Sequence, residues 1–342
     1  MKYWCLLICL SLGFGKEMYC QEYIANGQMP STARSNNQIY LVYGNGDSIF
    51  YSYSADKGKS FATPKLVQTL EGLASSHTRG PQIGVTSTGI VITACTNAGN
   101  VYSLTLNNEG KLVKQTRVND VDTLAKENLM AMSSDGNYVF TVWLDVRNGR
   151  NEIYGARSTD GGATWSKNIR IYHSPDSTVC ECCKPSVVVN GDNVHVMFRN
   201  WLHGNRDLYL ISSGDGGKTF GTAQKLGTGS WALNACPMDG GGLTADNNTI
   251  NTVWNRDGKI YADIPGEQEV KIGEGRSCNI SSFSGKNVYA WVENKQVIYL
   301  DSNKKKHSLG AGQLPIVKAI DDHTAICIWE SDKKIVKTLV KL

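Results

Sequence analysis

The sequence predicts an all-β fold, a single β-propeller with seven blades. Strand-like stretches and turn glycines run along the whole chain while helical periodicity is nearly absent, and one strand pattern recurs seven times. In each unit a β-branched strand and a short turn precede a second strand that ends in an aromatic residue, or once a cysteine. These seven residues lie 37 to 56 positions apart and are Tyr43, Cys95, Trp143, Phe198, Trp254, Trp291 and Trp329. Radial repetition of small sheets at this spacing forms a propeller and protects the sheet edges.

The two ends of the chain are expected to close the ring. The last unit, which contains "LPIVKAI", "TAICIWE" and "KIVKTLVKL", supplies only three strands. The segment "EYIANGQM" at 22–29 is predicted to complete that last sheet. Residues 21–342 are therefore interpreted as one propeller domain.

Residues 1–20 are predicted to be a signal peptide. The start "MKYWCLLICLSLGFG" has one lysine followed by a short apolar stretch that ends in small residues, and cleavage is expected after Gly15 or nearer Gln21. The apolar stretch is far shorter than the roughly 20 residues needed to cross a bilayer. The sequence thus predicts an exported protein without a transmembrane segment, in a compartment where disulfides form.

Charge and composition exclude one class of partner. The chain of 342 residues is 41% hydrophobic and 19% charged, with a net charge of +4. The only basic cluster is "NKKKH" at 303–307, and no nucleic-acid-binding module accompanies it. We therefore expect no nucleic acid among the partners.

Two units carry longer hairpins than the others. In the units of Trp143 and Phe198 the third strand restarts ten positions after the shared residue, at Ile153 and Leu208, instead of six. Longer loops on one face of a repeat fold often carry function.

Three units carry a sharper signature after the third strand: "SADKGKSF" (54–61), "STDGGATW" (158–165) and "SGDGGKTF" (213–220). This pattern resembles the Asp-box, or BNR, repeats of the sialidase-like superfamily. The elements "CECC" and "ACPMDGG" are similar to an exported bacterial branch of Asp-box proteins. The resemblance implies structural roles for Asp56, Asp160 and Asp215, and it makes a six-bladed, sialidase-type ring the alternative to seven blades.

The resemblance also implies a glycan-directed site at the starts of the first strands and the ends of the second strands. A sialidase holds the substrate carboxylate with arginines and uses an aspartic general acid, with a glutamate that assists a tyrosine nucleophile. Here the catalytic candidates are Asp145 and Glu127. The substrate-binding candidates are Arg79, Arg147, Arg199, Asp239 and Arg256.

This sequence departs from the sialidase pattern in two respects. The usual Arg-Ile-Pro motif is replaced by Arg79-Gly80-Pro81, and no tyrosine stands out as the nucleophile. The expected function is therefore to act on or bind glycans or another anionic small-molecule ligand. If the protein is an enzyme, it is expected to be a glycoside hydrolase of sialidase type. The alternatives are a non-catalytic glycan- or protein-binding propeller and a metal- or thiol-centred one.

The thiol-centred alternative rests on Cys180, Cys182, Cys183 and Cys236, which lie near the starts of first strands in consecutive units. A disulfide, for example Cys183 to Cys236, requires Cα atoms within about 7 Å. A site for zinc or copper would use these thiolates, although a Cys-x-Cys-Cys run lacks the paired spacing of common zinc sites. The third interpretation is that some of them are small buried apolar residues.

Overall fold

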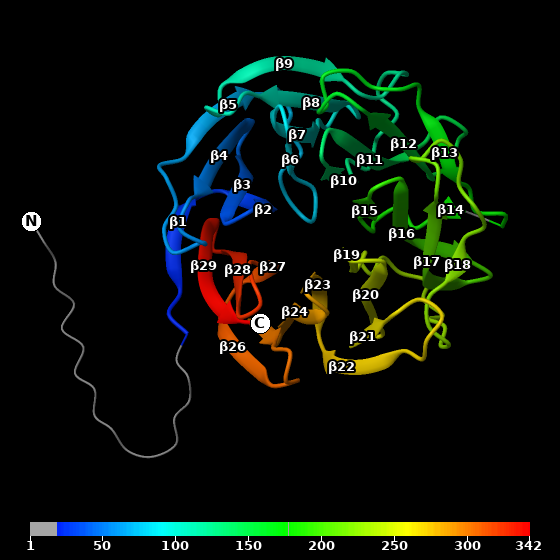
Figure 1. Cartoon of the computed structure of the whole chain (residues 1–342). Coiled ribbons are helices and arrows are strands. Elements are labelled where there is room, and N and C mark those ends of the chain that lie inside the picture. The colour runs from blue at the N-terminus through cyan, green and yellow to red at the C-terminus, as the bar shows by residue number, and fades with distance from the viewer. Residues whose placement is uncertain (1–18, 177) are drawn as a thin grey trace, which may run out of the picture.

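A computed structural model, which describes residues 19–342 apart from residue 177, shows a ring of seven antiparallel sheets (Figure 1). We call these sheets blades 1 to 7. The prediction of a seven-bladed, all-β propeller is confirmed, and the six-bladed alternative is wrong. The predicted signal peptide lies outside the described residues except for Tyr19 and Cys20.

The described strands follow one another around the ring. Blade 1 contains β2 (Gln28–Ser35), β3 (Gln38–Asn45), β4 (Ser48–Ser54) and β5 (Lys65–Thr69). Blade 2 contains β6 (Gln82–Thr86), β7 (Gly89–Cys95), β8 (Val101–Leu106) and β9 (Leu112–Arg117). Blade 3 contains β10 (Met130–Asp135), β11 (Tyr138–Asp145), β12 (Glu152–Ser158) and β13 (Ile169–Tyr172). Blade 4 contains β14 (Thr178–Val179), β15 (Ser186–Asn190), β16 (Asn193–Leu202), β17 (Asn205–Ser213) and β18 (Gln224–Lys225).

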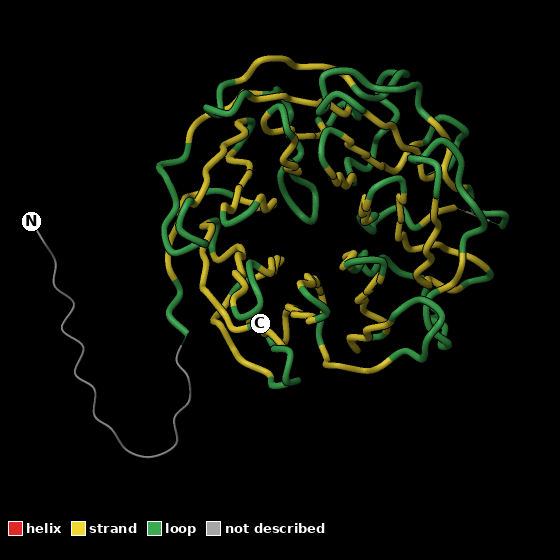
Figure 2. The backbone as a smooth tube through the Cα atoms, in the orientation of Figure 1, coloured by secondary structure: helices red, strands yellow, loops and turns green. Residues whose placement is uncertain are grey.

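The second half of the ring repeats the pattern. Blade 5 contains β19 (Gly242–Asp246), β20 (Thr249–Arg256), β21 (Lys259–Asp263) and β22 (Val270–Glu274). Blade 6 contains β23 (Arg276–Phe283), β24 (Lys286–Glu293), β25 (Gln296–Leu300) and β26 (Lys306–Ala311). Blade 7 contains β27 (Gln313–Ala319), β28 (Thr324–Ser331), β29 (Lys334–Lys341) and β1 (Glu22–Asn26). Figure 2 shows strands and loops only, and the described residues contain no helix that could span a membrane.

The ring closes as predicted, because β1 pairs with β29 beside it (Figure 1). Lys337 binds the Glu22 carboxylate across this pair at 2.8 Å. Two residues ahead of β1 also contact the propeller. The hydroxyl of Tyr19 lies 2.9 Å from that of Tyr299, and the carbonyl of Cys20 accepts a hydrogen bond from Thr338.

The repeat residues identified in the sequence form the core between blades. Each lies on the second strand of its blade and is at most 2% exposed: Tyr43, Cys95, Trp143, Phe198, Trp254, Trp291 and Trp329. Burying an aromatic side chain removes a large apolar surface from water. The repeat therefore marks where neighbouring blades pack together.

The three Ser-x-Asp-x-Gly turns are closed by the same hydrogen bonds. In the first, Asp56 accepts the N–H of Ser60 at 2.9 Å and its hydroxyl at 2.6 Å, while Ser54 Oγ accepts the N–H of Gly58 at 2.8 Å. The turns of Asp160 and Asp215 contain the same three bonds. The bonds from Ser60 and Ser54 hold the pKa of Asp56 well below its usual value. These aspartates organise turns, as we expected.

Each of these turns docks on the preceding blade. The glycines involved have positive φ and no room for a Cβ atom, which in Gly58 would lie 2.8 Å from a core side chain of blade 7. That side chain is Ile326. In the same way, Gly162 contacts Val91 of blade 2 and Gly217 contacts Phe140 of blade 3. The turns thus join blade 7 to 1, blade 2 to 3 and blade 3 to 4.

Candidate functional site

The candidate residues lie where first strands begin and second strands end, but they form four separate pairs instead of one cleft. The first pair is Asp145 with Arg147, at the end of β11. Asp145 is fully buried and accepts hydrogen bonds from Trp143 Nε1 and from Nε and Nη2 of Arg147, all at 2.9 Å. Arg147 also reaches Asp120 at 3.2 Å and stacks on Tyr154. This network fixes the base of the long β11–β12 hairpin.

The second pair, Arg79 with Glu127, joins blades 2 and 3. Arg79 Nε donates to the Glu127 carbonyl at 2.7 Å, and its Nη2 lies 3.9 Å from the Glu127 carboxylate. Burial raises the pKa of Glu127, although the charge of Arg79 opposes this shift. The Glu127 side chain is about one third exposed.

The third pair, Arg199 with Asp239, joins blades 4 and 5. All three bonding nitrogens of Arg199 donate to backbone carbonyls, those of Asp239 (3.0 Å), Arg206 (2.7 Å) and Asn255 (2.8 Å). The Asp239 carboxylate accepts the N–H of Ser277 from blade 6 at 2.7 Å. Both side chains are buried and thereby fasten three consecutive blades.

The fourth pair, Arg256 with Glu269, lies within blade 5. The two terminal nitrogens of Arg256 lie 2.8 and 2.6 Å from the two carboxylate oxygens of Glu269, a bidentate geometry. The guanidinium also stacks on the Tyr261 ring. Arg79, Arg199 and Arg256 therefore have different partners and are not brought together by any bond of the described residues.

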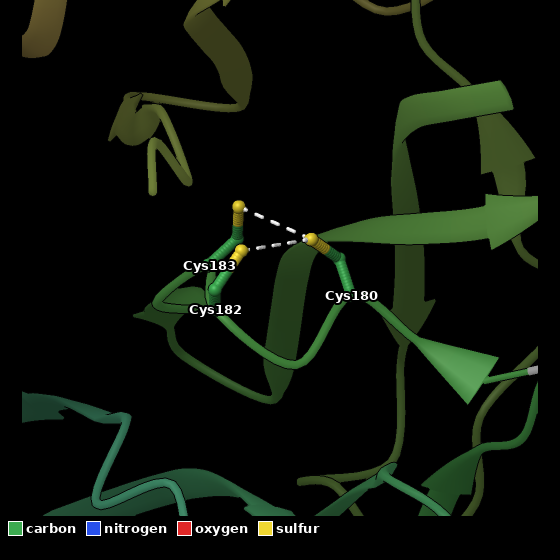
Figure 3. A group of neighbouring side chains, drawn as sticks. All are labelled: Cys180, Cys182 and Cys183. Atoms are coloured by element: carbon green, nitrogen blue, oxygen red, sulfur yellow. Dashed lines mark hydrogen bonds between the residues drawn. The ribbon is translucent and has the colours of Figure 1, made fainter. Parts of the chain in front are cut away.

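The cysteine cluster is compact (Figure 3). The sulfur of Cys180 lies 3.3 Å from that of Cys183 and 3.7 Å from that of Cys182. Cys182 forms a disulfide with Cys236, with Cα atoms 6.1 Å apart, so blades 4 and 5 are covalently joined. A disulfide was one of our interpretations, but the example pairing through Cys183 is wrong. Residues 180–183 form a turn, in which the N–H of Cys183 approaches the carbonyl of Cys180 at 3.4 Å.

The turn also shows a spacing that our sequence analysis overlooked. Cys180 and Cys183 are themselves a Cys-x-x-Cys pair with Cys182 between them, and this signal was present in the sequence. The three sulfurs lie within 4.8 Å of one another, as a metal site would require. The disulfide removes Cys182 from that set, however, and two thiols are fewer than the ligands of common zinc sites.

The environment of Cys180 favours its thiolate. The bond with Cys183 and the positive charge of Arg206, whose Nη1 lies 3.0 Å away, lower the pKa of Cys180 to about 7 although burial opposes this. Burial raises the pKa of Cys183 well above its usual value. The two thiols of the Cys-x-x-Cys pair thus differ strongly. Arg206, at the start of β17 in a long-hairpin unit, was not among our candidates.

A cleft lies between blades 2 and 3, lined by none of the cysteines, and was also not predicted. It has a volume of about 510 Å³ and lies between β9 with the loop after it and the turn that follows β12. Its lining combines two aromatic rings with charged and amide groups: Tyr102, Arg117, Asn119, Asp120, Trp165 and Lys167. Asp120 connects this cleft to Arg147, and through it to Asp145.

A smaller cavity of about 110 Å³ lies among the starts of the first strands of blades 1, 2, 4, 5, 6 and 7. Asp239 and Lys184 both line it, and the Lys184 ammonium donates to Gln82 at 2.9 Å. Burial lowers the pKa of Lys184 to about 8. Several residues at these strand starts have positive φ: Met29, Met238, Ser277 and Leu314.

Comparison with solved structures finds this fold in other proteins. The BP39L lectin from Burkholderia pseudomallei has a TM-score of 0.68 at 10% identity, over 93% of this chain and 97% of that one. An α-L-arabinofuranosidase from Fusarium graminearum has a TM-score of 0.55 at 10% identity, over 96% and 99%. An ulvan lyase of polysaccharide lyase family PL25 has a TM-score of 0.55 at 12% identity, over 94% and 95%.

Comparisons by sequence give no match. No protein-family model matches the chain, and no curated protein does so. At about 10% identity, the structural likeness shows the propeller fold, which this chain shares with a lectin, an arabinofuranosidase and a polysaccharide lyase.

Proposed function

We propose that this chain is an exported glycan-binding propeller that holds a sugar in the cleft between blades 2 and 3. The observation that carries the proposal is the composition of that cleft, in which Trp165 and Tyr102 stand beside Arg117, Asn119 and Asp120. Its volume of about 510 Å³ is in the range of small-molecule sites. A lectin and two glycan-processing enzymes have the same fold, which supports this proposal.

The groups around the cleft match the two kinds of surface that a sugar presents. Aromatic rings pack against the apolar C–H face of a pyranose, while carboxylates and amides bond its hydroxyl groups. The Asp120 side chain is 41% exposed and is fixed by the N–H of Asn168 at 3.0 Å. Arg117 is paired with Asp122, and Lys167 adds a positive charge that favours a sugar with a carboxylate or sulfate.

We propose binding instead of hydrolysis as the activity of this cleft. A glycosidase needs two carboxyl groups that reach the scissile bond. Asp145 is fully buried and its oxygens accept bonds from Trp143 and Arg147, and Glu127 pairs with Arg79 in a different place. The binding test therefore also measures whether free sugar is released, as a sialidase-type reaction would require.

The three Asp turns and the closed ring support the proposal that the chain belongs to the sialidase-like superfamily of Asp-box proteins. The Cys182–Cys236 disulfide supports export to an oxidising compartment. Both statements rest on the chain's own residues, since the structural likeness shows the fold alone.

A glycan array that includes neutral, carboxylated and sulfated sugars tests this function, followed by titration calorimetry of the best ligand with the parent and each variant. We expect Trp165→Ala and Asp120→Asn to weaken binding by more than about tenfold, because each removes a direct contact. Phe220→Ala, the equivalent aromatic in the turn of blade 4, and Asp192→Asn, an exposed carboxylate on that blade, are the matched controls. We expect both to bind within about twofold of the parent.

Two results would contradict the proposal. One is the absence of saturable binding to any glycan on the array, and the other is unchanged affinity in both cleft variants. Release of free sugar from a bound glycan, lost in Asp145→Asn, would replace binding by hydrolysis.

A further inference from the structure

The four cysteines next to the channel combine a dithiol with a disulfide, a feature that glycan binding does not use. Cys180 and Cys183 are free, and Cys182 is bonded to Cys236. The Cys180 sulfur faces the sulfurs of the other two, 3.3 Å from that of Cys183 and 3.7 Å from that of Cys182 (Figure 3). It is therefore in van der Waals contact with one sulfur of the disulfide.

The surroundings of the cluster stabilise negative charge on Cys180. Arg206 Nη1 lies 3.0 Å from its sulfur, and the same guanidinium stacks on Trp201 and pairs with Glu181 at 3.4 Å. The side chain of Arg206 is only 4% exposed, so its charge is poorly screened by water. Thiolates, not thiols, attack disulfides, and a buried arginine raises the thiolate fraction.

The cluster has one exposed end. Cys180, Cys182 and Cys183 are at most 7% exposed, whereas Cys236 is exposed on the loop before β19. External reagents can therefore reach the sulfur of Cys236, but not the dithiol behind it. The disulfide lies between the buried dithiol and the solvent.

We propose that these four cysteines form a thiol–disulfide relay, in which the buried Cys180–Cys183 dithiol delivers two electrons to an external disulfide at Cys236. The geometry that carries the proposal is the contact between Cys180 and the disulfide, with Arg206 at the attacking sulfur and Cys236 at the surface. The relay is independent of the glycan cleft between blades 2 and 3.

The exchange balances without any other reactant. The Cys180 thiolate attacks Cys182 Sγ, the Cys182–Cys236 bond breaks, and Cys236 leaves as a thiolate. Cys183 then loses its proton and attacks Cys180 Sγ, which forms a Cys180–Cys183 disulfide and releases Cys182. Finally, the Cys236 thiolate attacks an external disulfide and releases one thiol. Cys182 then resolves the mixed disulfide, releases the second thiol and restores Cys182–Cys236. Two thiols of the protein are oxidised and one external disulfide is reduced.

The test uses dithiobis(nitrobenzoate), a disulfide whose thiol product is coloured, on folded protein that contains a chelator. Cys5, Cys9 and Cys20 are first replaced by alanine, so that Cys236 is the only exposed cysteine among the described residues. We expect the parent to release about two equivalents of coloured thiol without retaining an adduct. Cys183→Ser should release about one equivalent and keep an adduct on Cys236, because Cys182 is then bonded to Cys180. Cys180→Ser should release none.

Peptide mapping under non-reducing conditions identifies the bonds. Trypsin gives one peptide with all three cluster cysteines, 171–199, because Lys184 precedes proline, and a second with Cys236, 226–256. The two peptides should remain linked in the parent and in Cys180→Ser, and separate in Cys183→Ser. Cys278→Ser, a buried cysteine outside the cluster, is the matched control and should behave as the parent.

Several outcomes would overturn the relay. One is that Cys180→Ser releases as much coloured thiol as the parent. Another is that the folded parent releases none although its thiols react after denaturation. A third is an adduct on Cys180 or Cys183. Release from the parent that occurs only with the chelator present would assign the thiols to a metal instead. Near-ultraviolet circular dichroism of the buried tryptophans shows whether each variant is folded. If Cys180→Ser does not fold, Cys183→Ser still tests the relay.

Discussion

Nη1 of Arg206 lies 3.0 Å from Sγ of Cys180, and the same guanidinium pairs with the Glu181 carboxylate. A buried arginine at this distance stabilises the thiolate over the thiol. Because the pKa of Cys180 is about 7, its thiolate fraction rises as the pH increases through 7. Thiol–disulfide exchange at this cluster should therefore be slow below about pH 6 and reach a plateau above about pH 8.

Arg206→Met should move this pH profile upward. Loss of the positive charge raises the pKa of Cys180, so we expect the exchange rate at pH 7 to fall about three- to tenfold. The rate of release of coloured thiol against pH measures the effect. Arg276→Met, which removes an exposed arginine, should leave the midpoint in place, and an unchanged midpoint in Arg206→Met would contradict the role of Arg206.

Gly217→Ala should destabilise the propeller by about 2–4 kcal/mol. Gly217 has a φ of +67°, and a Cβ atom there would collide with the Phe140 ring of the preceding blade. Gly214→Ala, three residues earlier, is a matched control, since its Cβ would lie 3.8 Å from its nearest neighbour, the Asn193 side chain. Denaturant unfolding of both variants checks this, and equal stability would mean that the turn docks less tightly than described.

Asp145→Asn should cost about 2–4 kcal/mol of folding stability, because one acceptor oxygen becomes an NH2 group and the arginine loses its buried counter-charge. Asp192→Asn changes an exposed carboxylate in the same way and should be within about 0.5 kcal/mol of the parent. The difference is measured by chemical denaturation. A stable Asp145→Asn protein would show that the pair is not needed for folding.

Lys184 should titrate near pH 8 in the folded protein, because burial lowers its pKa. Between pH 8 and the usual lysine pKa the unfolded chain binds the additional proton, so the free energy of unfolding should rise with pH across that window. Carbon-13 chemical shifts of reductively methylated lysines report the midpoint, with Lys184→Arg to assign the signal. A Lys184 signal that titrates with the surface lysines would contradict burial of its ammonium.

The fold was predictable because its main signal is local. Positions such as Trp143 and Trp329 each end a second strand and are fully buried, so the repeat that is visible in the sequence is the repeat that packs. Ring closure followed from the missing strand in the last unit. Neither required knowledge of any contact between distant residues.

The candidate site was less predictable because its partners come from elsewhere in the chain. The sequence located Arg199 and Arg256 near strand ends, but it did not reveal their partners. Arg199 donates to the carbonyls of Asp239 and Asn255, and Arg256 binds the carboxylate of Glu269. The pairing of Cys183 with Cys236 was offered only as an example of a disulfide, since nothing local in the sequence distinguishes Cys182 from Cys183. Residues 180–183 form a turn, in which the sulfur of Cys180 lies 3.3 Å from that of Cys183 while Cys182 is bonded to Cys236.

The joints between blades are not equally reinforced. Asp turns hold three of them, between blades 7 and 1, 2 and 3, and 3 and 4, and the Cys182–Cys236 disulfide holds a fourth, between blades 4 and 5. The described residues place neither device between blades 1 and 2, between blades 5 and 6 or between blades 6 and 7. Blades 5, 6 and 7 are thus joined by two consecutive interfaces that have neither an Asp turn nor a disulfide. Local thermal opening of the ring should therefore begin at these interfaces.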